Sequence, residues 1–168
     1  MSIQTHATSK GTAQNWVNWL IVTLGLAVIA FSASPNGPLG SFWRPSSDAP
    51  PPTGAQLPLF ILLNVAEVLA FGIGVSFLIF GYAAVRRVLP QSRALAFAAY
   101  LSIAWLLANW WPHDSLHIHN GMNLSGLLAI EYGFHITLMA AGTILVYFFF
   151  ALVRQQSTVS SRSAEQAG

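Results

Sequence analysis

The chain has 168 residues, of which 54% are hydrophobic and only 7% are charged, and its mean hydropathy is +0.57. A soluble domain of this length would carry about 25% charged residues, so the composition predicts an integral membrane protein. The formal charge of +2 comes from only seven basic residues, too few and scattered for a nucleic-acid-binding surface. Cysteine is absent, which excludes disulfides, thiolate metal sites and cysteine nucleophiles.

Four apolar segments are each long enough to cross a bilayer core of about 30 Å. They cover residues 16–33, 57–85, 94–111 and 124–153. We therefore expect an all-α integral membrane protein, a four-transmembrane-helix bundle that forms one domain over residues 15–153. The alternative for the first segment is a cleaved signal peptide, because small residues such as Ala30 and Ala33 lie near its end.

The remaining segments are polar or irregular. Residues 1–14 are expected to form a loose cytoplasmic arm, and residues 154–168 a disordered cytoplasmic tail. The outer loop 34–56 is rich in Pro, Gly and Ser and cannot form a regular element. Such a loop is either a lid, here anchored by Phe42 and Trp43, or an unstructured connector. A second outer loop is predicted over residues 112–123.

The basic residues are distributed unevenly between the two ends of this arrangement. One side receives Lys10, Arg86, Arg87, Arg93, Arg154 and Arg162, and the other side receives Arg44. The positive-inside rule then places both termini in the cytoplasm. We expect location in the plasma (inner) membrane, with the two outer loops and the candidate site on the extracytoplasmic side.

Ionisable residues gather between Asn109 and His135, a stretch with four of the five histidines and two of the five acids. Glu131 and His135 are four residues apart and share a helical face. With Glu67, they should lie at membrane depth. Each buried ionisable group costs about 2.5–3.5 kcal/mol there, so these side chains should face the interior and pair. Asn64 and Glu67 form a similar predicted pair.

The candidate site therefore combines imidazole and carboxylate groups. Its predicted ligands are His113, Asp114, His117, His119, Glu131, His135 and Glu67. This set suits copper, zinc or iron, so we predict a transition-metal site for metal handling or for redox or hydrolytic chemistry. Haem b is the less favoured cofactor, because only His135 lies well inside a span.

The spacing of the loop histidines leaves two conformations open. A helical turn begun by Pro112 would align His113 with His117, whereas an extended loop would align His117 with His119. An Asp and His group at a membrane surface, with a further His on the next helix, loosely resembles the copper site in the C subunit of particulate methane monooxygenase. The spacing differs from that family, so no residue role is carried over.

Two other functions fit the same residues. One is a proton-coupled carrier or channel component that uses Glu67, Glu131 and His135. The other is a structural or accessory subunit whose polar pairs fix helix packing. Besides the lipid bilayer, the expected partner is a second copy or a larger membrane complex, with a small-residue stripe at Ala66, Ala70 and Gly74 as the contact surface. No nucleotide-binding motif is present, so no nucleotide is expected, and no enzyme class follows.

Overall fold

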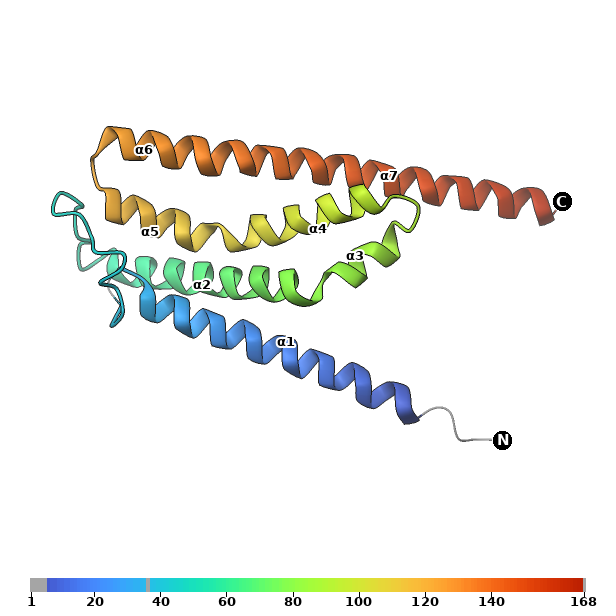
Figure 1. Cartoon of the computed structure of the whole chain (residues 1–168), viewed down its shortest axis with the longest axis horizontal. Helices are drawn as coiled ribbons and strands as arrows, with labels where there is room; N and C mark the ends of the chain where they lie inside the picture. Colours follow the sequence, from blue (N-terminus) through green and yellow to red (C-terminus); the bar gives the residue numbers. More distant parts are fainter. Residues whose placement is uncertain (1–5, 36, 168) are drawn as a thin grey trace.

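The computed structural model describes residues 6–35 and 37–167, with side chains described over 15–35 and 37–157. Within these ranges the chain is helical and contains no strand. The elements are α1 (His6–Ala33), α2 (Leu57–Phe80), α3 (Tyr82–Val88), α4 (Arg93–Ala108), α5 (Trp110–Asn120), α6 (Leu124–Ile130), the π-helical η1 (Glu131–His135) and α7 (Ile136–Ala167) (Figure 1). Residues 1–5 of the predicted arm lie outside the described residues.

Three helical stretches are long and apolar enough to cross a membrane, and a bent pair supplies a fourth if it is one span. They are Asn15–Ala33, Leu57–Phe80, Leu124–Ser157 and the pair Arg93–Ala108 plus Trp110–Asn120. The described chain is thus all-helical with three to four candidate spans, as the composition predicts.

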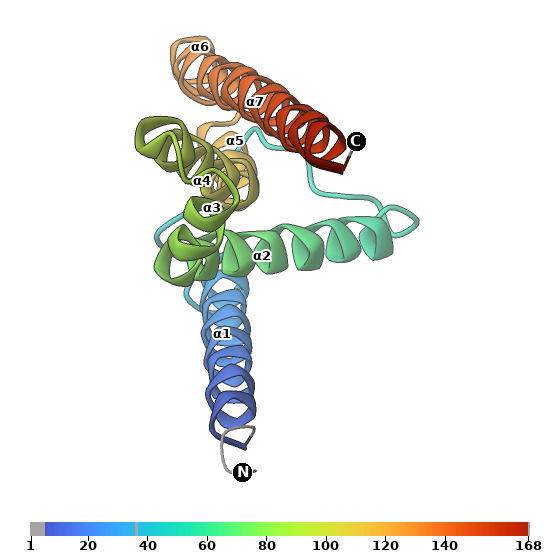
Figure 2. The ribbon, with the colours of Figure 1, turned by 90° about the vertical axis from the view of Figure 1, so that its right-hand side faces the viewer.

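The helices pack in a row. α1 lies against α2, α2 against α4 and α4 against α7, so that α1 and α7 form opposite edges (Figures 1 and 2). Glycines allow the close approach: a Cβ atom at Gly72 would lie 2.4 Å from the Thr23 carbonyl oxygen, and one at Gly74 would lie 2.7 Å from Ala108 N. The small-residue stripe that we expected to contact another chain therefore packs, at Gly74, against α4 of the same chain.

Two apolar clusters hold this row together. One joins α3, α4 and α7, and its buried members are Val85, Leu89, Ala96, Ala99, Tyr100 and Phe148. The other joins α1 and α2 through Ala27, Ala30 and Val68, with Phe71 and Trp111 packed against it. The second cluster reaches α5 through Trp111, and so fixes the end of the row where the candidate site lies.

The second predicted span, 57–85, is divided at Gly81 into α2 and α3. Glycine weakens a helix interior by about 1 kcal/mol relative to alanine. The chain continues as a short helix, because Gly81 N–H still donates to the Phe77 carbonyl oxygen at 2.7 Å. α3 then ends at Val88, where the Arg86 guanidinium donates to the Leu89 carbonyl oxygen at 2.9 Å.

The third predicted span, 94–111, ends earlier than expected, and most of the predicted loop 112–123 is helical. α4 stops at Ala108, and α5 follows after a bend of 46°. Pro112 explains the break, because it has no N–H for the carbonyl group of Ala108, four residues before it. Proline is tolerated in the first turn of α5, which ends at Gly121 in a left-handed conformation with φ of 56°.

Both polar ends of the chain extend the neighbouring helices. α1 begins at His6, about ten residues before the predicted start of the first span, and α7 runs to Ala167, past the predicted end at Val153. Residues 154–167 contain neither proline nor glycine, the usual helix terminators. The prediction of a disordered tail is therefore wrong for the described backbone.

The loop 34–56 is irregular, as its composition predicts. Trp43 anchors it, because its ring packs edge-on against Trp111 with centroids 6.0 Å apart. Phe42 only packs on Trp43 and is 76% exposed. Of the two expectations for this loop, the structure favours a segment fixed to the helices, with one aromatic anchor in place of the two predicted.

Candidate functional site

The first part of the site is a pair of histidines on α5. His113 and His117 are one helical turn apart, and their Nε2 atoms face each other at 3.2 Å. The structure thus adopts the helical alternative for the Pro112 segment. At this distance one nitrogen donates and the other accepts, so one proton lies between the two rings.

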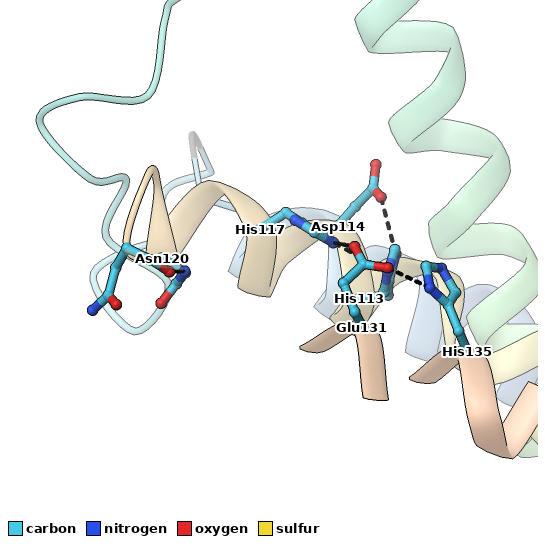
Figure 3. A network of polar contacts seen from close by, with 7 residues as sticks. His113, Asp114, His117, Asn120, Glu131 and His135 are labelled. Carbon is cyan, nitrogen blue, oxygen red and sulfur yellow. Dashed lines mark hydrogen bonds and ion pairs between the residues drawn. The ribbon is translucent and has the colours of Figure 1, made fainter. Parts of the chain in front are cut away.

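Glu131 connects this pair to the next helical segment. Its Oε1 lies 3.6 Å from His117 Nε2, and its Oε2 forms a short ion pair with His135 Nδ1 (Figure 3). Glu131 and His135 begin and end η1. Single π-helical turns within α-helices occur frequently at functional sites. The predicted Glu131–His135 pair is therefore present, and it contacts α5.

Two carboxyl groups extend the cluster on its other side. Asp114 Oδ1 lies 3.5 Å from His113 Nδ1, which is buried and makes no hydrogen bond. The Asp114 carboxyl group also lies within hydrogen-bonding reach of the carboxyl group of Glu67 on α2. A hydrogen bond between two carboxyl groups needs a proton on one of them. Glu67 thus meets Asp114, which is one of the ligands predicted with it.

Six of the seven predicted residues therefore form one line. In order, they are Glu67, Asp114, His113, His117, Glu131 and His135. Its members come from α2, α5 and η1, and Figure 3 shows the part from Asp114 to His135. Within the line, the His113 side chain is 12% exposed, whereas those of Asp114 and His135 are 40% and 50% exposed.

Phe134 is a neighbour of the site that the sequence analysis missed. Its ring packs edge-on against His113, with centroids 5.1 Å apart, and stacks on Trp105 at 5.7 Å. It thereby fixes the His113 ring between α4 and η1. The sequence offered no specific signal for this contact, because Phe134 is one of eleven phenylalanines in the chain.

His119 does not join the line. Its exposed ring lies with Nδ1 2.9 Å from the backbone carbonyl oxygen of Arg44 in the outer loop. The same loop donates from Ser46 N–H to the Ile118 carbonyl oxygen at 3.0 Å. His119 therefore helps to hold the loop across the end of α5, and its prediction as a site residue gains no support.

Asp48 completes this loop attachment. Its Oδ2 accepts a hydrogen bond from Met122 N–H at 3.1 Å, and its Oδ1 accepts one from the Ser46 hydroxyl. The Ser46 hydroxyl and then the Met122 amide lower the pKa of the Asp48 carboxyl group, because both donate to its charged form. Gly121 is required beside it, since a Cβ atom there would lie 2.0 Å from Asp48 Oδ1.

The predicted pair of Asn64 and Glu67 is replaced by contacts between helices. Asn64 Oδ1 accepts a hydrogen bond from the Ser34 hydroxyl at 3.1 Å. Ser34 Oγ in turn accepts one from Trp111 Nε1–H at 3.0 Å. Asn64 thus helps to join the end of α1 to α2 and α5, while Glu67 turns toward Asp114.

The extended shape of the line matters for metal binding. Among the described residues, no group of three or more His, Asp or Glu side chains is arranged to hold a metal ion. Each member instead faces one or two neighbours in succession. Comparison with protein-family models, curated proteins and solved structures finds no match.

Proposed function

We propose that this protein is a proton-conducting component of a membrane, in which a line of titratable side chains moves protons between Glu67 and His135. The observation that carries the proposal is the 3.2 Å separation of His113 Nε2 and His117 Nε2, with Glu131 within ion-pair distance of His117 and His135. Ionisable groups inside a membrane commonly form such proton paths.

The geometry assigns a step to each side chain. A proton that enters at the Glu67–Asp114 pair passes to His113 Nδ1, and His113 releases a proton from Nε2 to His117. His113 thus takes up a proton on Nδ1 and releases one from Nε2, which leaves the remaining ring proton on the opposite nitrogen. Glu131 likewise uses one oxygen toward His117 and the other toward His135. For each proton that enters at Asp114, one leaves from His135, and the His113 ring and the Glu131 carboxyl group must turn over before the next proton can follow.

Movement is required between Asp114 and His113 Nδ1, which lie 3.5 Å apart without a hydrogen bond, and again at His117. His117 Nε2 faces both His113 at 3.2 Å and Glu131 at 3.6 Å, so the same atom must receive a proton and pass it on. The longer distance exceeds a normal hydrogen bond. A small rotation of the His117 ring toward Glu131 closes this gap, and we expect that rotation to limit the rate.

The proposal includes an orientation. Arg86, Arg87 and Arg93 flank the α3–α4 turn, and Gln91 in that turn donates to Gln155 of α7 at 2.7 Å, which places Arg154 at the same end. α5 and α6 lie at the opposite end (Figure 1), and Arg44 belongs to the same end because its carbonyl oxygen contacts His119 of α5. Under the positive-inside rule, both termini are cytoplasmic and the line lies in the extracytoplasmic half of the membrane.

The test is proton flux into liposomes that contain the purified protein and an internal pH-sensitive dye. Glu131→Gln keeps the shape of the side chain and removes its titration, so it should lower the flux about a hundredfold, the lower range for a positioned proton-transfer group. Asp48→Asn is the matched control, because Asp48 is an acid outside the line. Wild-type flux equal to that of empty liposomes, or equal flux in wild type and Glu131→Gln, contradicts the proposal.

The same preparations separate this function from the metal site predicted from the sequence. Elemental analysis of wild type should show only trace copper, zinc and iron. Near-stoichiometric metal that disappears in a His117→Ala, His135→Ala double variant would replace the proton path with a metal site. That measurement does not depend on the flux assay.

A further inference from the structure

The Glu131–His135 pair is uncovered at the edge of the row of helices. The two side chains are 46% and 50% exposed. His135 lies about 16 Å along the helix from Leu124 at 1.5 Å per residue, within the candidate span Leu124–Ser157. Lipid chains offer no hydrogen bonds, so ionisable groups at this depth pair or face polypeptide. In a membrane, the pair needs a polar partner on its open side.

A regular stripe of side chains runs through His135. Its members follow one another at alternating intervals of three and four residues. We call this stripe the α7 seam, formed by Met139, Gly142, Val146 and Phe149 of α7 together with Tyr132 and His135 of the preceding η1. Met139 is 65% exposed, and a Cβ atom at Gly142 would meet no atom within 4 Å. Alternating intervals of three and four are the pattern by which helices pair in coiled coils.

We infer that the α7 seam binds the α7 seam of a second copy of this chain, across a two-fold axis along the helices. The surface is complementary to itself, because it carries both an acid, Glu131 at its border, and a base, His135 within it. In lipid, apolar contact alone gives little net association, so the polar pair and the open space at Gly142 favour a matching helix. A single polar residue in such a seam fixes the register, which brings the His135 side chains of the two copies together.

α7 is free to make this contact because of its place in the fold. It packs on α4 and forms one edge of the row (Figures 1 and 2). The seam side chains Met139, Val146 and Phe149 are exposed. The contact also bears on the proposed proton path, and this consequence rests on that proposed function. Two lines of titratable groups would meet at the axis through His135, so that each copy supplies the missing neighbour of the other.

Cysteine cross-linking tests the contact directly, because the natural chain contains no cysteine. Met139→Cys and Val146→Cys each place a single thiol on the seam of the full chain. Ala140→Cys and Tyr147→Cys are matched controls, one residue further along and about 100° around the same helix. Membranes that contain each variant are treated with a thiol oxidant and analysed without reductant.

The seam variants should give a disulfide-linked dimer at least roughly fivefold more abundantly than the controls, because only seam positions approach the axis. Absence of dimer, equal yields in seam and control variants, or adducts only with a protein of another mass would overturn the inference. Cross-linking does not depend on proton movement. If the protein cross-links but conducts no protons, the interface is supported and the proposed function is contradicted. If it conducts protons but does not cross-link at the seam, the proposed function stands and the interface is contradicted.

Discussion

His113 and His117 face each other through their Nε2 atoms at 3.2 Å, because both lie on one side of α5. The bend at Ala108 and the resumption of the helix at Trp110 create this arrangement. A straight continuation of α4, or an extended loop, would have separated the two rings. Their contact turns two separate pairs, Asp114–His113 and Glu131–His135, into one connected line.

The first prediction compares His117 and His119, which were both predicted as site residues from the sequence. His117→Gln should lower proton flux about a hundredfold, because it removes the ring between His113 and Glu131. His119→Gln should leave the flux within about twofold, within the scatter expected for a residue outside the site, since His119 contacts the Arg44 backbone instead. Both variants are measured in the same liposome assay. Equal loss in the two variants would show that the outer loop, rather than the line, controls the flux.

The second prediction concerns the close contact of α1 and α2. Gly72→Ala places a methyl group 2.4 Å from the Thr23 carbonyl oxygen, so the helices must separate. Overpacking of this kind typically costs about 1–3 kcal/mol. Thermal unfolding in detergent should show a lower Tm for this variant. Gly25→Ala on α1 is the control, because a Cβ atom there meets nothing within 4 Å, and an equal fall in both variants would contradict this packing.

The third prediction follows from the lowered pKa of Asp48. A carboxyl group whose pKa is lower in the folded chain stabilises the folded form at pH values above its ordinary pKa of about 3.9. That contribution is lost as the pH falls through the lowered pKa. The Met122 amide, which donates to Asp48, should therefore be protected from hydrogen exchange at neutral pH and lose protection below about pH 4.

In Asp48→Asn, the Met122 amide should already be weakly protected from hydrogen exchange at neutral pH. Lowering the pH should then cause no further loss of protection. Exchange is followed by mass spectrometry, with rates corrected for the intrinsic effect of pH. Ser47→Ala, at an exposed position next to Asp48, is the control and should behave as wild type. Protection of Met122 that is independent of both acid and Asp48 would contradict the proposed attachment of the loop.

The fourth prediction tests the hydrogen bonds that join α1, α2 and α5. Trp111→Phe keeps an aromatic ring beside Phe71 and removes the Nε1–H that donates to Ser34. Hydrogen bonds between membrane helices contribute about 0.6 kcal/mol on average and up to about 1.7 kcal/mol. The variant should therefore lower the free energy of unfolding by an amount within that range. Trp110→Phe is the matched control at a 48% exposed position, and an equal effect there would assign the loss to ring size alone.

The sequence by itself determined the features that depend on neighbours along the chain. Apolar runs set the number of candidate spans, and Pro and Gly content predicted the irregular loop 34–56. The four-residue spacing of Glu131 and His135 predicted their contact, which the structure contains. Helical periodicity and hydropathy are local properties, so they can be read before any helix is packed against another.

The tertiary structure alone decided which helices meet and which side chains face one another. Glu67 reaches Asp114 rather than Asn64, because α2 packs against α5, and His119 turns to the outer loop because α5 ends at Gly121. The bend at Pro112 and the close approach at Gly72 and Gly74 set the rotation and separation of the helices. Contacts between helices depend on these quantities, which arise only when the whole row is packed.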